Sequence, residues 1–414
     1  MRLNLRIFSR FTLALQWVLK VLLVSIVCIG LGHSENAPEE RDNVRGDKAS
    51  SSFNPIRFKS VYSLALGEEL FGRGIAHQRA GQHKEAIKML RRATHITRVN
   101  SGLHTALQLP MIEAEIESLM HLNLFEQVDK RQIYLRKVQS ASLIDNTKIV
   151  QGLIKQAEWQ KKAYQLDLSS SEEEKMIRLI DTLNLYREAL TLLAKEQGEK
   201  SRMLLEPLYG ILRTQYLLSG FIGKSLGPYE QSTSRLGNDS GRAYRSQNFR
   251  QGKQIISAIY GVEKHHTENI VEAAQYSLTM LADWMLWNGK RGDAERTYMK
   301  ATRVGLTESE EDLEKDTTTP AEIFRNPVPL PQLEGFSPLP ETTPPESADL
   351  LISFDVTKTG KATNIKRLDD NDIEEAIARK IIRRISRTRF RPRLELGEVI
   401  TAEGITYGFD TSKW

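Results

Sequence analysis

Apolar residues recur every three or four positions along most of this chain, and the period changes to two only near its end. From residue 61 to about residue 307 the pattern is typical of amphipathic helices joined by short turns. Between residues 349 and 409, runs of alternating residues predict strands around a single amphipathic helix. We therefore expect a mostly α chain, with a helical solenoid over 61–307 and a small α+β domain over 348–414.

Two distant segments carry small and apolar residues in the same register. They are Leu70, Gly74, His77, Gly81, Ala86, Leu90 and Ala93, and then Leu278, Leu281, Ala282, Gly289, Ala294, Tyr298 and Ala301. Both resemble the tetratricopeptide repeat (TPR), although Arg73 and Arg98 replace its usual Leu and Pro. The resemblance implies stacked helical hairpins that bind protein or peptide partners. The packing residues would be Gly74, Ala86, Ala93, Ala282, Ala294 and Ala301.

The chain between these two segments follows the same plan in a degenerate form. Residues 111–139 predict a helix, a turn at Asn123 and a second helix, and residues 184–220 predict another such pair. One stretch breaks the pattern: residues 223–247 are rich in Gly and Ser, and we expect a long loop there.

The terminal domain is predicted to run strand, strand, helix, strand. "DLLISFDV" and "KATNIKRL" read as two strands around a turn that ends at Gly360, and residues 372–389 read as the helix. "EVITAEGITYGF", residues 398–409, is the last strand of this ββαβ order.

This domain resembles the TonB C-terminal domain of bacterial energy-transducing proteins. The residues that carry the resemblance are Phe354, Asp355, Val356, Gly360, Ile365, the run "RFRP" from Arg389 to Pro392, Gly397 and Val399. The stretch "LDDND" departs from it, because family members often have a loop with Ser and Gly there. The resemblance implies that the last strand is an exposed edge to which an outer-membrane transporter adds an extended peptide.

The partner-binding residues of that strand would be Val399, Ile400, Thr401, Ala402, Ile405, Tyr407 and Phe409. The alternative is that the small sheet simply packs on the solenoid. A basic cluster near the helix end, with Arg383, Arg384, Arg387, Arg389 and Arg391, could contact an anionic partner. Such arginines also form solvated faces and favourable charges at a helix C-terminus.

Residues 308–347 join the two parts. They begin with an acidic run, 308–316, which we expect to be a solvated end of the solenoid, and they continue with a Pro-rich stretch. Proline favours extended polyproline II, so a free spacer is expected here. The apolar residues Phe324, Leu330, Leu333 and Phe336 could instead lie along the solenoid.

The amino terminus predicts export. Arg2, Arg6 and Arg10 precede an apolar run that ends at Leu31, and small residues follow up to Ser34. Residues 1–34 are therefore either a cleaved signal peptide or an anchor that spans the inner membrane through residues 11–31. A polar tether follows over 35–60. Together with the TonB resemblance, this export predicts a periplasmic protein of a Gram-negative envelope.

Composition adds little further chemistry. The net charge of +5 over 414 residues is mild, and export argues against a nucleic-acid partner. The only cysteine, Cys28, lies in the apolar run, so the exported part has no disulfide. His265 and His266 match no zinc motif, and no P-loop or nucleophile elbow is present, so we expect no metal, cofactor or catalytic residue.

The sequence thus predicts a non-enzymatic envelope scaffold or adaptor with a TonB-like tip. Two alternatives remain open. One is a membrane-anchored energy transducer for outer-membrane transport, which would keep residues 11–31 as its anchor. The other is an enzyme whose site no local motif reveals.

Overall fold

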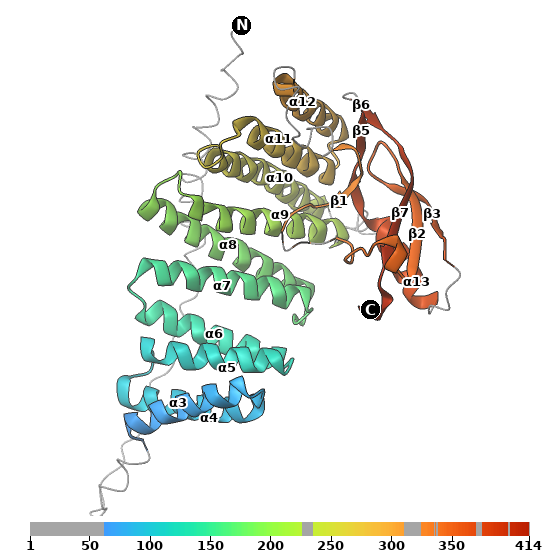
Figure 1. Cartoon of the computed structure of the whole chain (residues 1–414). Helices are drawn as coiled ribbons and strands as arrows, with labels where there is room; N and C mark the ends of the chain where they lie inside the picture. Colours follow the sequence, from blue (N-terminus) through green and yellow to red (C-terminus); the bar gives the residue numbers. More distant parts are fainter. Residues whose placement is uncertain are drawn as a thin grey trace, which may run out of the picture. The chain divides into compact units, whose positions relative to one another are not determined.

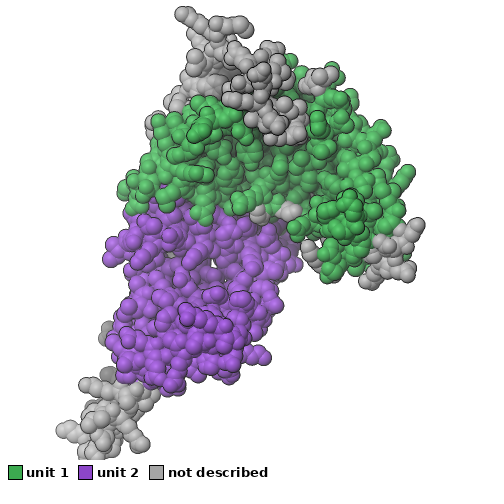
Figure 2. Space-filling view, viewed as in Figure 1, with its two compact units in different colours: residues 1–19, 194–414 green, residues 20–193 purple. Residues whose placement is uncertain are grey.

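The computed structural model describes residues 62–225, 235–309 and 324–413, except 335, 337, 370–374 and 396–397. The predicted signal or anchor, the tether and most of the acidic run lie outside these residues. The described chain forms two compact units, residues 62–193 and 194–413, which are coloured separately in Figure 2. In the described part, no helix is both long and apolar enough to cross a bilayer.

The first unit consists of helices that pack consecutively along the chain (Figure 1). Its elements are α3 (Leu64–Arg79), α4 (His83–Ser101), η1 (Ala106–Gln108), α5 (Leu109–His121), α6 (Phe125–Ser142), α7 (Asn146–Gln165) and most of α8 (Glu172–Gln197). Gly81 (φ 73°) and Asn123 (φ 55°) make the turns between α3 and α4 and between α5 and α6, as the sequence predicts. Leu90, Ala86 and Ala93 are completely buried on α4, which lets α3 and α4 lie close together.

The second unit begins with helices of the same kind. They are η2 (Arg202–Leu204), α9 (Leu205–Ser225), α10 (Arg235–Glu263), α11 (Ile270–Trp287) and α12 (Arg291–Ser309). The prediction of a long loop over 223–247 is wrong for much of its length, because α9 continues to Ser225 and α10 begins at Arg235. Gly and Ser lower helix propensity by only about 1 kcal/mol or less each, and neighbouring helices can offset that cost.

The same unit ends in a small sheet region. Its elements are β1 (Val328–Leu330), η5 (Pro345–Ser347), β2 (Leu350–Val356), β3 (Ala362–Arg367), α13 (Glu375–Arg387), β4 (Arg389–Arg391), β5 (Arg393–Glu395), β6 (Glu398–Ile400), β7 (Ala402–Phe409) and η6 (Thr411–Lys413). An antiparallel sheet has the order β3-β2-β7, and two short ribbons pair β1 with β4 and β5 with β6.

Alternation along β2 builds the core of this region. Every second residue from Leu350 to Val356 is fully buried, and these residues contact the apolar face of α13 and Phe390 of β4. Ile381 and Ile385 supply the α13 face. The predicted strand, strand, helix, strand order is therefore present, with additional short strands between α13 and β7.

Candidate partner-binding surfaces

A buried ion pair fixes the sheet region to the helices of its unit. Arg391 of β4 donates from Nε and Nη2 to the two carboxylate oxygens of Asp283 on α11, over 2.9 and 2.6 Å. The two side chains are 4% and 5% exposed. Tyr298 of α12 donates to the same carboxylate over 2.6 Å, and Gln332 accepts a second bond from Arg391 over 2.9 Å. Two charges this deeply buried are tolerated because both carboxylate oxygens of Asp283, and Nε and Nη2 of Arg391, have hydrogen-bond partners.

The pKa values of this cluster follow from its burial. Burial alone lowers the pKa of Arg391, but the Asp283 carboxylate outweighs it and raises that pKa above its ordinary value. The pKa of Tyr298 is also raised well above its ordinary value, first by burial and then by the Asp283 charge. Arg391 is therefore always a cation here, and the phenol always keeps its proton.

This arrangement removes two arginines from the predicted anionic-partner patch. Arg391 is buried, and Arg389 donates to the carbonyl oxygens of Leu286 and Trp287 over 2.5 and 3.3 Å. Burial lowers the pKa of Arg389. Arg389 and Arg391 are two positions apart on β4, so their side chains lie on the same side of the strand, toward α11. The interpretation of all five arginines as one exposed face is thus wrong for Arg389 and Arg391.

The Pro-rich stretch, where described, does not behave as a free spacer. Val328, Pro329 and Leu330 pair with β4, and Phe324 and Leu330 are 1% and 0% exposed. These two side chains share one apolar cluster with Leu286 and Tyr298. Proline is tolerated in β1 because the strand is a short edge. The alternative left open by the sequence, that the apolar residues of this stretch lie along the helices, is observed for Phe324 and Leu330.

The predicted partner-binding strand is divided in two. Val399 and Ile400 belong to β6, which pairs with β5, and Val399 joins the buried cluster on α11 and α12. Thr401 is exposed between the strands, and the other four residues, Ala402, Ile405, Tyr407 and Phe409, belong to β7. Ala402 and Phe409 are buried, while Ile405 and Tyr407 are half-buried. Four of the seven predicted residues therefore lie on β7, which is an edge of the three-stranded sheet.

The outer edge of β7 is open along part of its length. Leu351 of β2 directs its N–H to Asp369 and its C=O to Leu368, both away from β7. Its partner Gly408 therefore points its backbone groups outward, and by alternation Thr406 does the same. The Gly408 carbonyl already accepts a 2.8 Å bond from Thr343 N–H, and the Gly404 N–H donates to the Asp355 carboxylate over 2.9 Å, so the open part of the edge is at Thr406.

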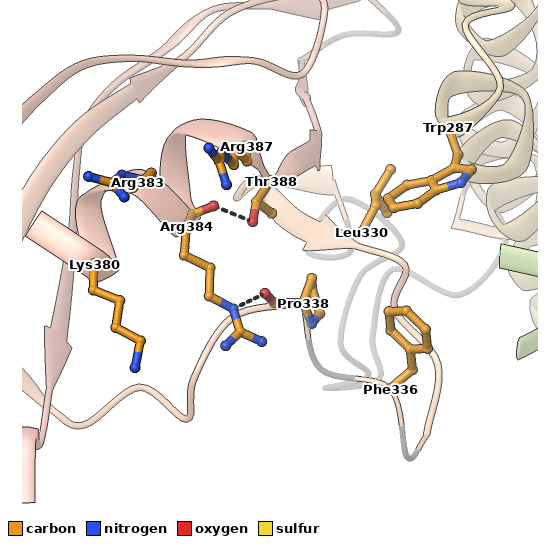
Figure 3. A pocket seen from close by; sticks show the side chains of 9 residues that line it. All are labelled: Trp287, Leu330, Phe336, Pro338, Lys380, Arg383, Arg384, Arg387 and Thr388. Atoms are coloured by element: carbon orange, nitrogen blue, oxygen red, sulfur yellow. Dashed lines mark hydrogen bonds between the residues drawn. The ribbon is translucent and has the colours of Figure 1, made fainter. Parts of the chain in front are cut away.

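The remaining arginines of the predicted patch lie on a groove in the same unit. Arg383, Arg384 and Arg387 line it together with Lys380 and Thr388 of α13 and its C-terminal end, opposite Trp287, Leu330, Phe336 and Pro338 (Figure 3). Its volume is about 480 Å³. Arg384 donates from Nε to the Pro338 carbonyl over 2.9 Å. The groove thus combines an apolar wall with a row of cations.

The six small residues predicted to pack TPR-like hairpins are all buried: Gly74, Ala86, Ala93, Ala282, Ala294 and Ala301. A Cβ at Gly74 would come within 2.8 Å of the Leu90 side chain, so the close approach needs glycine. The residues described contain no group of three or more His, Cys, Asp or Glu placed to hold a metal ion. Sequence reasoning missed Asp283, whose signal is an acid inside the apolar run "LADWML".

The solved structures that resemble this chain include proteins with TPR-like helical repeats. A variant of a putative kinesin light chain from Podosopora anserina with nearly identical TPR-like repeats is 13% identical, with a TM-score of 0.34, over 63% of this chain and 100% of that one. BtubC (BKLC) from P. vanneervenii is 11% identical, with a TM-score of 0.33, over 64% of this chain and 88% of that one. No family model matches the chain. No curated protein matches it either. Scores this low carry no argument about what the chain binds.

Proposed function

We propose that this chain is a non-enzymatic scaffold or adaptor of the cell envelope whose C-terminal sheet region captures an extended peptide by strand addition to β7. Export to the envelope rests on the amino-terminal sequence alone. Capture of an outer-membrane transporter segment rests on the resemblance of residues 348–411 to the TonB C-terminal domain.

The open edge of β7 is the observation that carries the proposal. An incoming strand would pair with the outward backbone groups of Thr406, and backbone bonds need no particular side-chain sequence. The other edge of the sheet, β3, is less suitable. It is shorter, it carries Lys366 and Arg367, and Asn364 interrupts it with a φ of 51°.

Part of the β7 edge is covered by the chain's own backbone, which an incoming peptide must either displace or leave in place. The segment around Thr343 and η5 lies against Gly408, where a Cβ would meet the Thr343 carbonyl at 2.5 Å. A captured peptide therefore has two routes: it pairs only from Ile405 to Tyr407, because the Gly404 N–H already donates to Asp355, or it also displaces the Thr343 bond. Both routes use Thr406.

Substitution at Thr406 tests the proposal. Thr406→Pro removes the outward N–H and leaves the bonds between β7 and β2 in place, since Thr406 does not bond to β2. Thr406→Val keeps the N–H and is the matched control. In cells, a photo-crosslinking residue at Glu403 should capture an outer-membrane transporter with the native chain and with Thr406→Val, and should lose it with Thr406→Pro. Equal capture by Thr406→Pro, or no transporter recovered, would refute strand addition.

A further inference from the structure

The groove beside α13 has features that strand addition at β7 does not use. Its cationic side is made by Lys380, Arg383, Arg384 and Arg387, which are all exposed. Its apolar side is made by Trp287 of α11 and by the chain around β1. Figure 3 shows the two sides facing each other across an open space.

The helix dipole accounts for only part of this charge. A cation is favoured in the last turn of a helix, where Arg384 and Arg387 lie. Arg383 lies one position before that turn and four positions before Arg387, so the two like charges are neighbours on the helix surface and repel each other. Among the described residues neither is in an ion pair, whereas Arg379 on the same helix pairs with Glu375 over 2.6 Å. An anion in the groove would relieve the repulsion.

The apolar side is rigid. Tyr216 meets the Trp287 ring edge-on at a centroid distance of 5.4 Å, and Arg389 bonds to the Leu286 and Trp287 carbonyls. Leu330 is held by the pairing of β1 with β4. Because the residues of this wall are already ordered, binding a partner side chain does not require the loss of their conformational entropy.

A second cavity of about 320 Å³ continues the groove past Phe336 and Pro338, which line both. It is lined by Tyr276, Gln332, Glu334 and the prolines around β1. Glu334 makes this end unfavourable for anions. An occupant that extends along both cavities therefore has its negative charges at the α13 end.

From these features we propose that the groove binds a protein segment in which carboxylates flank an aromatic or aliphatic side chain. The carboxylates pair with Arg383 and Arg387, and the apolar side chain lies on Trp287 and Phe336, which are partly exposed in the groove. A lipid surface fits less well, because the exposed apolar wall is only Trp287, Phe336 and Pro338, and a cavity of about 480 Å³ takes a few side chains. The inference is independent of β7, which does not line the groove.

Fluorescence anisotropy of the full chain with a labelled peptide tests it. The probe has one phenylalanine flanked by glutamates, and a second probe replaces that phenylalanine with alanine. We expect the first probe to bind, and Arg383→Gln with Arg387→Gln to weaken binding about tenfold or more, since two charge-assisted bonds are lost. Added salt should weaken binding as well.

Matched controls separate the groove from general charge and from β7. Arg379→Gln removes a cation from the same helix outside the groove and should change affinity less than about twofold. Thr406→Pro should leave affinity unchanged. The alanine probe should bind several-fold more weakly.

Three results would overturn the proposal. They are equal loss with Arg379→Gln, equal binding of the two probes, and an Arg383/Arg387 dependence seen with phosphatidylglycerol vesicles but not with the phenylalanine probe. The last result would assign the groove to a lipid surface instead.

Discussion

The α3–α4 and α11–α12 hairpins have the same register of small residues but differ at two positions that pack beside those residues. Both turn at a glycine with positive φ, Gly81 and Gly289. In the first hairpin both of these positions are apolar. Ile75 follows Gly74 on α3, and the Leu90 side chain covers Gly74. In the second hairpin, Asp283 stands at the position of Ile75, and Tyr298 at that of Leu90.

Those two polar residues change what the hairpin can do. Tyr298 and Arg391 together satisfy the Asp283 carboxylate, so α11 and α12 hold β4 as well as each other. The first hairpin instead packs on α5 through apolar residues, with Ala86 and Leu90 beside Ala114. The shared repeat pattern therefore gives the hairpin, and the buried polar residues of the second hairpin select a strand as its neighbour.

Removing the buried Asp283 carboxylate should have the largest effect on stability, and only at the second hairpin. Asp283→Ala leaves Arg391 buried without its partner and should cost about 3–5 kcal/mol. We expect hydrogen exchange at the amides of β4 and β1 to accelerate, with the α3–α4 hairpin unaffected. Asp283→Ala combined with Arg391→Met should recover part of the loss. Asp293→Ala, which removes an exposed ion pair on α12, should cost less than about 1 kcal/mol. Equal effects of the two aspartates would contradict this account.

A second, smaller effect is expected at Gly252 of α10. A Cβ there would come within 2.3 Å of the Trp284 ring, which is fully buried and donates to the Phe249 carbonyl over 3.0 Å. Because the ring cannot move freely, Gly252→Ala should destabilise the second unit by about 1–3 kcal/mol in urea unfolding.

The matched control is Gly261→Ala on the same helix, where a Cβ would meet nothing within 4 Å. It should be neutral or stabilise by up to about 1 kcal/mol, because alanine has the higher helix propensity. If both variants behaved alike, close packing of α10 on Trp284 would not be the cause.

The smallest effect on stability is expected when Gly74 of the first hairpin is replaced by alanine, the residue at the equivalent position of the second hairpin. Gly74→Ala places a Cβ within 2.8 Å of Leu90, whereas Ala282 is accommodated beside Tyr298. The strain should outweigh the gain in helix propensity, for a net loss of about 1 kcal/mol. Hydrogen exchange of α3 and α4 would measure it. Gly74→Ala with Leu90→Ala should remove the clash, at the cost of a cavity; a stabilising single variant would contradict the argument.

Sequence patterns predicted the structure correctly where a residue type has one strong local conformational preference. The turns at Gly81, Asn123 and Gly289 and the alternation of β2 follow from local conformational preference. Arginine has no such preference that would tell whether its side chain is exposed or buried. Arg383 and Arg387 line an exposed groove, while Arg391, a few positions later, is buried against an aspartate more than a hundred residues earlier in the chain.

The sequence by itself determined most helices, turns and strands, because period and turn chemistry act between near neighbours. It did not show that α10 begins at Arg235 or that residues 328–330 form a strand. It also determined which faces are apolar and must be covered. Only the tertiary structure decided what covers them: β1 pairs with β4, Leu330 and Val399 lie on α11 and α12, and Asp283 meets Arg391. The physical reason is that burial and ion pairing depend on distance in space, which the spacing of residues along the chain does not specify.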